Sequence, residues 1–322
     1  MGIIVAGDTG GTKTYLGLYE STRGQLRPIR AQSFRTLDFT CLEHIVETFL
    51  NGEVVNAACF GLAGPVIDGR CEVTNIRWIV DTKSVAARLR IARVALLNAL
   101  IATAYGISEL PEEEVFVLQQ GRSLPGQAQA LIAAGTGLGE CGLHWNGQQY
   151  VPVAGEGGHA DWAPHDDIHI ELWRYLRAQL PEVGTERVVS GPGLVSCYCF
   201  LRDTRVHSEP DVLTKPNGEE AAAIITRHAE AGTSRLCQQA LDIFLSAYGA
   251  EAGNLALRSM AVGGVYVGGG IAPKLLPHLG GSFLRAFREK YLLSHLMPDI
   301  PIKVILNDRT ALLGAAHCAA RL

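Results

Sequence analysis

The sequence predicts an α/β fold built from two related halves, and three observations support this prediction. Strands and helices alternate along the chain, which is the pattern of α/β proteins. A strand, a glycine-rich turn and a second strand occur at residues 3–20 and again at 131–145. Each of these segments is followed by a hairpin signal, Arg-Gly at 23–24 and Asn-Gly at 146–147. The repetition indicates two α/β domains with nucleotide chemistry between them.

The first half is expected to contain both strands and helices. Its first strand is continuously apolar, whereas the second alternates between apolar and polar residues, as half-buried strands do. In order, we expect strands at 3–7, 14–20 and 26–33, a helix at 40–50, a strand at 54–62, a short hairpin at 66–75, a helix at 82–90, a strand at 93–97 and a helix at 98–107.

Residues 109–130 hold prolines, acidic residues and a polar stretch, and therefore indicate a domain boundary. We expect a small domain at 1–108, completed by the C-terminal segment 301–322, and a large domain at 109–300. Beyond the second glycine turn, the large domain is expected to contain helices at 166–180, 218–231 and 234–258 and a strand that leads into Gly268-Gly269-Gly270. A last strand at 302–306 leads to an alanine-rich helix at 309–321, which we expect to pack on the first domain.

Composition excludes several classes of function. The 322 residues are 48% hydrophobic and 19% charged, as in an ordinary globular protein, and the net charge is −4 from 28 basic and 32 acidic residues. Without a basic arm, this balance argues against nucleic-acid and anionic-membrane partners. No signal peptide and no run of about 18 apolar residues is found, and the eight cysteines form no CxxC pair. We therefore expect a cytoplasmic protein with reduced, mostly buried thiols.

The first glycine turn, GDTGGTK at residues 7–13, has the residue types of a phosphate site. Glycine permits positive φ and leaves no Cβ in the way, so backbone N–H groups can approach phosphate oxygens. Asp8 could hold Mg²⁺ through water, while Thr12 and Lys13 could donate to the phosphates. A tight hairpin capped by Asp8 explains this turn equally well when it is taken alone. The turn is not a P-loop, because GxxxxGK[ST] is absent.

Together with the second turn, GTGLG at residues 135–139, the first turn resembles the two phosphate loops of the sugar kinase, actin and Hsp70 superfamily. Further segments resemble the bacterial glucokinase family that includes the enterobacterial enzyme, and they occur in family order over nearly the whole chain. They are GLAGP at 61–65, TNIRW at 74–78, AGEGGHADWAP at 154–164 and ERVVSGPGL at 186–194. The CxCGxxGC pattern of the repressor-like sugar kinases is missing, so no structural zinc is expected.

This resemblance implies two ribonuclease-H-like domains of the actin-like ATPase type flanking a cleft, ATP and Mg²⁺ as cofactors, and a homodimer. It assigns ATP to the two glycine turns and to an adenosine loop, with the residues Asp8, Gly10, Gly11, Thr12, Lys13, Gly135, Thr136, Gly137, Gly268, Gly269 and Gly270. It assigns glucose to Asn98, Glu156, His159 and Glu186. Carboxylates accept hydrogen bonds from pairs of sugar hydroxyls, and imidazole serves one more.

Alternative interpretations of the sugar residues remain open. Glu156-x-x-His159 could be half of a metal site, helped by His165 and His169, although the intervening glycines break the helix that such a site normally uses. We expect His165 and His169 to be surface residues on a loop and at a helix start. If the resemblance failed, Glu186 could form a surface ion pair with its neighbour.

One position departs from the family pattern. The family has its general base, an Asp, directly after the Asn at the end of strand 93–97, whereas this chain has Ala99. Alanine cannot accept the proton of a sugar hydroxyl, and neither Asp8 nor Asp161 is a convincing replacement. We therefore expect ATP-dependent phosphorylation of glucose with impaired turnover. A catalytically silent sugar- or nucleotide-binding regulator and a kinase for another hexose are the alternatives, and the alanine could be an introduced change or a natural loss.

Overall fold

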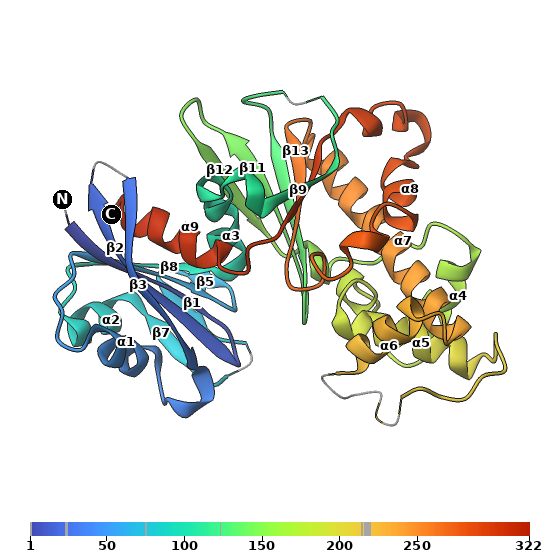
Figure 1. Cartoon of the computed structure of the whole chain (residues 1–322), viewed down its shortest axis with the longest axis horizontal. Helices are drawn as coiled ribbons and strands as arrows, with labels where there is room; N and C mark the ends of the chain where they lie inside the picture. The colour runs from blue at the N-terminus through green and yellow to red at the C-terminus, as the bar shows by residue number, and fades with distance from the viewer. Residues whose placement is uncertain (1, 23–24, 75, 123, 214, 216–219) are drawn as a thin grey trace. The chain divides into compact units, whose positions relative to one another are not determined.

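The computed structural model describes residues 2–22, 25–74, 76–122, 124–213, 215 and 220–322 (Figure 1). The chain divides into two compact units. The first comprises Met1–Glu114, Tyr150–Pro152 and Asn307–Leu322, and the second comprises Val115–Gln149 and Val153–Leu306. The sequence predicts domain boundaries at 108/109 and 300/301. These boundaries stay a prediction.

The sheet of the first unit has the strand order β3-β2-β1-β4-β8. β1 pairs antiparallel with β2 and β2 with β3, whereas β1, β4 and β8 run parallel. The strands are β1 (Gly2–Thr9), β2 (Lys13–Thr22), β3 (Gln25–Arg35), β4 (Ala57–Leu62) and β8 (Arg93–Asn98). A small sheet contains β5 (Val66–Ile67), β6 (Arg70–Glu72) and β7 (Ile79–Asp81).

Alternation along these strands produces two apolar faces, because successive side chains of a strand point to opposite sides of the sheet. One face, which includes Val5 and Phe60, packs against helices α1 (Leu42–Leu50) and α2 (Thr82–Leu89). The other, which includes Ile4 and Cys59, packs against α9 (Thr310–Ala319). Figure 1 shows α9 across the sheet from α1 and α2. The C-terminal helix therefore packs on the first sheet, as the sequence predicts.

The sheet of the second unit has the strand order β12-β11-β10-β13-β14-β9. β10 pairs antiparallel with β11 and parallel with β13, which repeats the arrangement of β1 with β2 and β4. The strands are β9 (Val115–Gln119), β10 (Gln129–Ala134), β11 (Leu138–Trp145), β12 (Tyr150–Gly155), β13 (Gly264–Gly268) and β14 (Ile302–Ile305).

Helices supply much of the core of the second unit. They are α4 (Asp167–Arg177), α5 (Gly191–Asp203), α6 (Ala221–Glu230), α7 (Arg235–Ser259) and α8 (Ser282–Arg288), while α3 (Ala99–Gly106) belongs to the first unit. The 25-residue helix α7 is buried along most of its length, which explains why apolar residues recur over most of its surface. Short 3₁₀ turns complete the chain: η1 (Thr36–Asp38), η2 (Ile107–Glu109), η3 (Glu112–Glu114), η4 (Gly157–His159), η5 (Thr185–Arg187), η6 (Leu276–His278), η7 (Tyr291–Leu293) and η8 (Met297–Asp299).

The structure confirms the predicted α/β class, and it adds elements that the sequence analysis missed, among them β9, α5 and α8. Strand β9 lies inside the segment interpreted as a boundary, where it pairs antiparallel with β14. Helix α5 begins at a Gly-Pro-Gly sequence that is typical of loops. It forms because the Ser190 hydroxyl caps it by accepting from the N–H of Gly193 at 3.0 Å.

Of the two hairpin signals, only the second, at residues 146–147, lies within the described residues. At the second, the N–H of Asn146 donates to the carbonyl of Gln149 at 3.1 Å, and Gly147 has a φ of 96°. This turn is a hairpin between β11 and β12. The first signal, at 23–24, lies outside the described residues, as do Asn75 of the TNIRW segment and residues 218–219 of the expected helix 218–231.

The cysteines agree with the expectation of free, mostly buried thiols. Each is free; those at 59, 71, 141, 197 and 237 are buried, and those at 41, 199 and 318 are half-buried. Across the part of the chain that the structure describes, every helix is too short or too polar to span a bilayer.

Candidate functional site

The glycine turn of the first unit joins β1 to β2. The N–H of Gly10 donates to the carbonyl of Lys13 at 3.0 Å, which closes the turn. The hydroxyl of Thr36 donates to the carbonyl of Gly10 at 2.9 Å and anchors it to the end of β3. Lys13 donates from Nζ to the hydroxyl of Tyr15 at 3.3 Å. The backbone of this turn is fixed by its own hydrogen bonds, as a preorganised anion site requires.

Asp8 lies near the end of β1, directly before this turn. Burial of its carboxyl, together with the negative charge of Asp308, raises its pKa to about 6. Burial disfavours the charged form of Asp8, and the charge of Asp308 repels it. A bound cation would offset both effects. The donor set at Asp8 therefore fits Mg²⁺.

Asn98 and Ala99 stand where β8 ends and α3 begins. The Asn98 side chain accepts from the N–H of Leu100 at 2.8 Å and donates to the carbonyl of Gly64 at 3.0 Å, so it caps the helix. A Cβ placed on Gly61 would lie 3.7 Å from Ala99 Cα and 3.7 Å from Asp8 Oδ1. Asp8 and position 99 are therefore neighbours on either side of Gly61.

The glycine turn of the second unit joins β10 to β11 and is held by Glu186. The Glu186 carboxylate accepts from the N–H of Leu138 at 2.8 Å, and a Cβ at Gly137 would overlap it. The N–H of Gly191 donates to the carbonyl of Gly135 at 2.8 Å, which ties the turn to the start of α5.

The glycines of the two phosphate turns do not adopt positive φ. The glycines with positive φ in the described chain do not include Gly10, Gly11, Gly135 or Gly137. The second turn needs glycine at position 137 because the Glu186 carboxylate lies against it, where any side chain would clash.

The loop that carries Glu156 and His159 lies beside η5, which carries Glu186. The N–H of Thr185 donates to the carbonyl of Ala160 at 2.9 Å, and a Cβ at Gly184 would lie 3.3 Å from the carbonyl of His159. The segments that carry three of the predicted sugar residues therefore lie side by side, and Glu156 and His159 are exposed. Two carboxylates and an imidazole on neighbouring segments have the hydrogen-bonding groups that polyol hydroxyls require.

The third glycine segment follows β13 and lies beside the second turn. Gly269 has a φ of 81°, and a Cβ there would overlap the carbonyl of Ala134, so only glycine fits. The N–H of Ile271 donates to that same carbonyl at 3.3 Å. A Cβ at Gly270 would meet open space. The backbone at 268–270 therefore passes close to the end of β10, one residue before Gly135.

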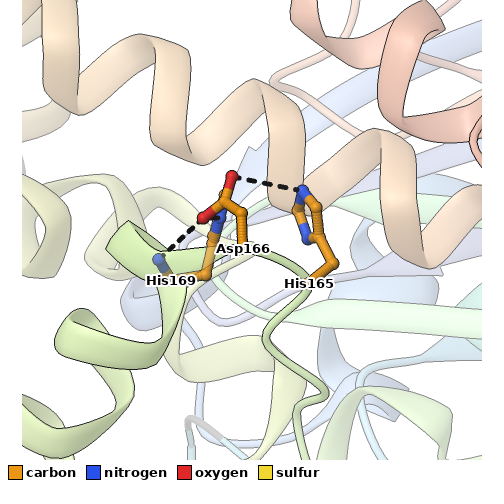
Figure 2. A group of neighbouring side chains, drawn as sticks. All are labelled: His165, Asp166 and His169. Carbon is orange, nitrogen blue, oxygen red and sulfur yellow. Dashed lines mark hydrogen bonds and ion pairs between the residues drawn. The ribbon is translucent and has the colours of Figure 1, made fainter.

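Two histidines and an aspartate form a compact group at the start of α4 (Figure 2). Asp166 caps the helix by accepting from the N–H of His169 at 3.0 Å, and its Oδ1 lies 2.5 Å from His169 Nδ1. The Nε2 of His169 lies 3.2 Å from the carbonyl of Ile243, and the Nε2 of His165 lies 2.9 Å from the hydroxyl of Ser246. These bonds join α4 to α7.

This group corrects the expectation that both histidines are surface residues. The expectation is wrong for His169, which is only 1% exposed between α4 and α7, and it holds for His165, which is exposed. Burial, together with the charge of His169, lowers the pKa of His165 to about 4. The ligand atoms are close enough for a metal, but each already has a partner within the protein. Among the described residues, the predicted rival pair Glu156 and His159 belongs to no such group.

A buried charged group was missed by the sequence analysis. Glu140 on β11 is 3% exposed and Glu251 on α7 is 6% exposed, and both are bound by Arg258. The signal was available in the sequence, because each glutamate interrupts an otherwise apolar stretch. Glu140 also follows the second glycine turn directly.

Comparisons with known proteins identify the family. The glucokinase family model matches residues 5–322. A glucokinase of Nostoc sp. is 41% identical over 342 residues, which cover 100% of both chains. The crystal structure of a glucokinase from an Antarctic psychrotroph superposes with a TM-score of 0.86 at 26% identity and covers 99% of each chain. A ROK family glucokinase from Streptomyces griseus, solved in complex with glucose and AMPPNP, shares the fold, with a TM-score of 0.66 at 21% identity over 99% of this chain and 100% of that one.

Proposed function

Because this chain belongs to the glucokinase family, we propose that it binds ATP and glucose and transfers the γ-phosphoryl group to the sugar 6-hydroxyl. The observation that carries this proposal is that the segments with Glu156, His159 and Glu186 lie beside the second glycine turn. A polyol site that adjoins a phosphate-sized turn is what a sugar kinase requires. The glucose and AMPPNP bound by the Streptomyces griseus protein support the same pair of ligands.

For the nucleotide, we assign the phosphates to the two glycine turns and the adenosine to 268–270. The preorganised N–H groups of the turns, together with Thr12 and Lys13, would donate to phosphate oxygens. Asp8 would hold Mg²⁺ through water, and the metal would neutralise charge on the β- and γ-phosphates. The raised pKa of Asp8 agrees with a carboxylate that is adapted to a nearby cation.

For the sugar, we assign hydroxyl binding to Glu156, His159, Glu186 and Asn98. Asn98 is fixed by two hydrogen bonds at the start of α3, so its position is set before any ligand arrives. Position 99 follows it directly and neighbours Asp8. This is where the family's general base would accept the proton of the attacking 6-hydroxyl.

With alanine at position 99, we infer that turnover is impaired. A positioned general base contributes on the order of 10²–10⁴ in rate, or about 2.7–5.5 kcal/mol of the barrier. Alanine favours the helix and leaves no unpaired charge, so the sugar and phosphate residues keep their places. The same observation favours a second candidate function, that of a regulator that binds sugar and nucleotide without turnover.

Measuring glucose-dependent ADP formation by the chain and by its Ala99→Asp variant tests the proposal. We expect the variant to be faster by on the order of 10²–10⁴. The control is Ala92→Asp, which adds the same charge at an exposed position before β8. If both the chain and the Ala99→Asp variant are silent, the regulator is favoured. If the unaltered chain is already fast, position 99 is not the site of the base.

A further inference from the structure

A buried charged group supports the loop that carries Glu156 and His159. The Glu140 side chain projects from β11, and a Cβ at Gly157 would overlap its Oε2. The carbonyl of Glu140 lies 3.3 Å from where a Cβ at Gly155 would be. Glu140 therefore packs directly against the backbone of the loop, between the two residues that we assign to the sugar.

Helix α7 supplies the partners of Glu140. Arg258 donates from Nη2 to Glu140 Oε2 at 3.1 Å, and the same nitrogen donates to Glu251 Oε1. Asn254 donates to Glu251 Oε2 at 3.1 Å, and Lys290 in turn donates to Asn254 Oδ1 at 2.8 Å. The half-exposed guanidinium of Arg258 therefore donates hydrogen bonds to two buried carboxyls.

This arrangement lacks one hydrogen-bond donor. Within the described residues, Glu140 Oε1 is buried and has no partner. The carboxyl of Glu251 is within hydrogen-bonding reach of Glu140, but two carboxylates can only repel each other. A proton on one carboxyl supplies the missing donor and removes the repulsion. Burial and the charge of Glu251 raise the pKa of Glu140 to about 8, against the opposing effect of Arg258, which favours the protonated carboxyl at neutral pH.

We propose that Glu140 and Glu251, with one proton between them, position the loop at 155–159 for sugar binding. This inference rests on the proposed function. Loss of the proton sets two charges against each other beneath Gly157, which loosens the loop and weakens sugar binding. The other ionisable groups that face the pair are Arg258 and the Tyr248 phenol on α7, the Cys141 thiol on β11, and Lys290, which faces Glu251.

The test compares the unaltered chain with Glu140→Gln, Glu140→Ala and Glu251→Gln between pH 6 and 9. Glutamine keeps the shape of the protonated carboxyl, and its amide donates at every pH. Calorimetry gives the glucose affinity, and hydrogen–deuterium exchange, corrected for the intrinsic pH dependence, gives the order of the loop at 155–160. For the unaltered chain, we expect the affinity to fall by up to about tenfold for each pH unit above the pKa of Glu140, toward the weak binding of Glu140→Ala. The affinity of Glu140→Gln should stay level, while Glu140→Ala should bind weakly and exchange its loop amides faster at every pH.

Glu171→Gln, at an exposed glutamate of α4, is the matched control and should behave as the unaltered chain. The inference is overturned if Glu140→Gln keeps the alkaline loss, or if Glu140→Ala leaves both affinity and loop exchange unchanged. Absence of glucose binding by the unaltered chain at every pH would count against the proposed function alone. Hydrogen–deuterium exchange of the loop would then decide the inference. Faster exchange at alkaline pH that Glu140→Gln abolishes would support the inference, and exchange without this change would contradict it. The melting temperature of each variant, Glu251→Gln included, separates these effects from loss of folding.

Discussion

At the scale of single residues, Glu140 shows how burial converts a side chain into a pH-dependent contribution to stability. Its pKa is raised from 4.5 to about 8 in the folded chain. At pH values between 4.5 and about 8, the folded state therefore keeps a proton on Glu140 that the unfolded state has released. A group of this kind stabilises fully below the lower pKa and loses its contribution as the pH rises through the upper one.

We therefore predict that the free energy of unfolding falls as the pH rises from about 5 to 8, relative to the Glu140→Gln variant, and levels off above 8. The comparison with the variant is needed because His165 acts in the opposite direction, since its pKa is lowered. Urea unfolding at intervals of half a pH unit measures the difference. A difference between the two proteins that does not change with pH would show that Glu140 is not protonated in the folded chain.

At the scale of elements, α3 and α9 pack with their backbones in contact. A Cβ at Gly314 would overlap the carbonyl of Ala102, and a Cβ at Gly106 would overlap that of Thr310. These two glycines allow α9 to lie against the helix that begins at Ala99. The position of Asn98 and Ala99 thus depends on a helix from the other end of the chain.

We predict that Gly314→Ala lowers the free energy of unfolding by about 1–3 kcal/mol, because the added methyl forces the two helices apart. This loss outweighs the gain of about 1 kcal/mol that alanine brings to a helix interior. Chemical denaturation measures it. Gly280→Ala is the control, since a Cβ there would meet nothing within 4 Å. Stability equal to or above that of the unaltered chain would contradict the close packing of α3 and α9.

Local signals explain which elements the sequence predicts. The strand–turn–strand segments β1–β2 and β10–β11 are predicted because apolar runs and glycines lie next to each other in the chain. Helix α5 is missed because its loop-like first residues need the Ser190 cap to become helical. Charged pairs such as Glu140 and Arg258, 118 residues apart, depend on the packing of α7 beneath β11, which no local pattern contains.

At the scale of the whole molecule, the two ends of the chain form one core. Leu312 and Ala316 of α9 are buried together with Ile4, Ala6 and Cys59 of the first sheet. The apolar core of the second unit contains no residue of this helix among those described. The first unit therefore cannot complete its core until the last residues of the chain are present, whereas the second has its own core.

We predict that a chain ending at Leu306 fails to fold its first unit and keeps its second. Removal of α9 exposes one apolar face of the first sheet, which costs about 25 cal/mol for each Å² of apolar surface returned to water. Hydrogen–deuterium exchange should show loss of protection in β1 and β4, while α7 stays protected. The control is a chain that ends at Ala320, since Arg321 and Leu322 are exposed. If β1 and β4 stay protected without α9, the helix is dispensable; if α7 loses protection as well, the units fold as one.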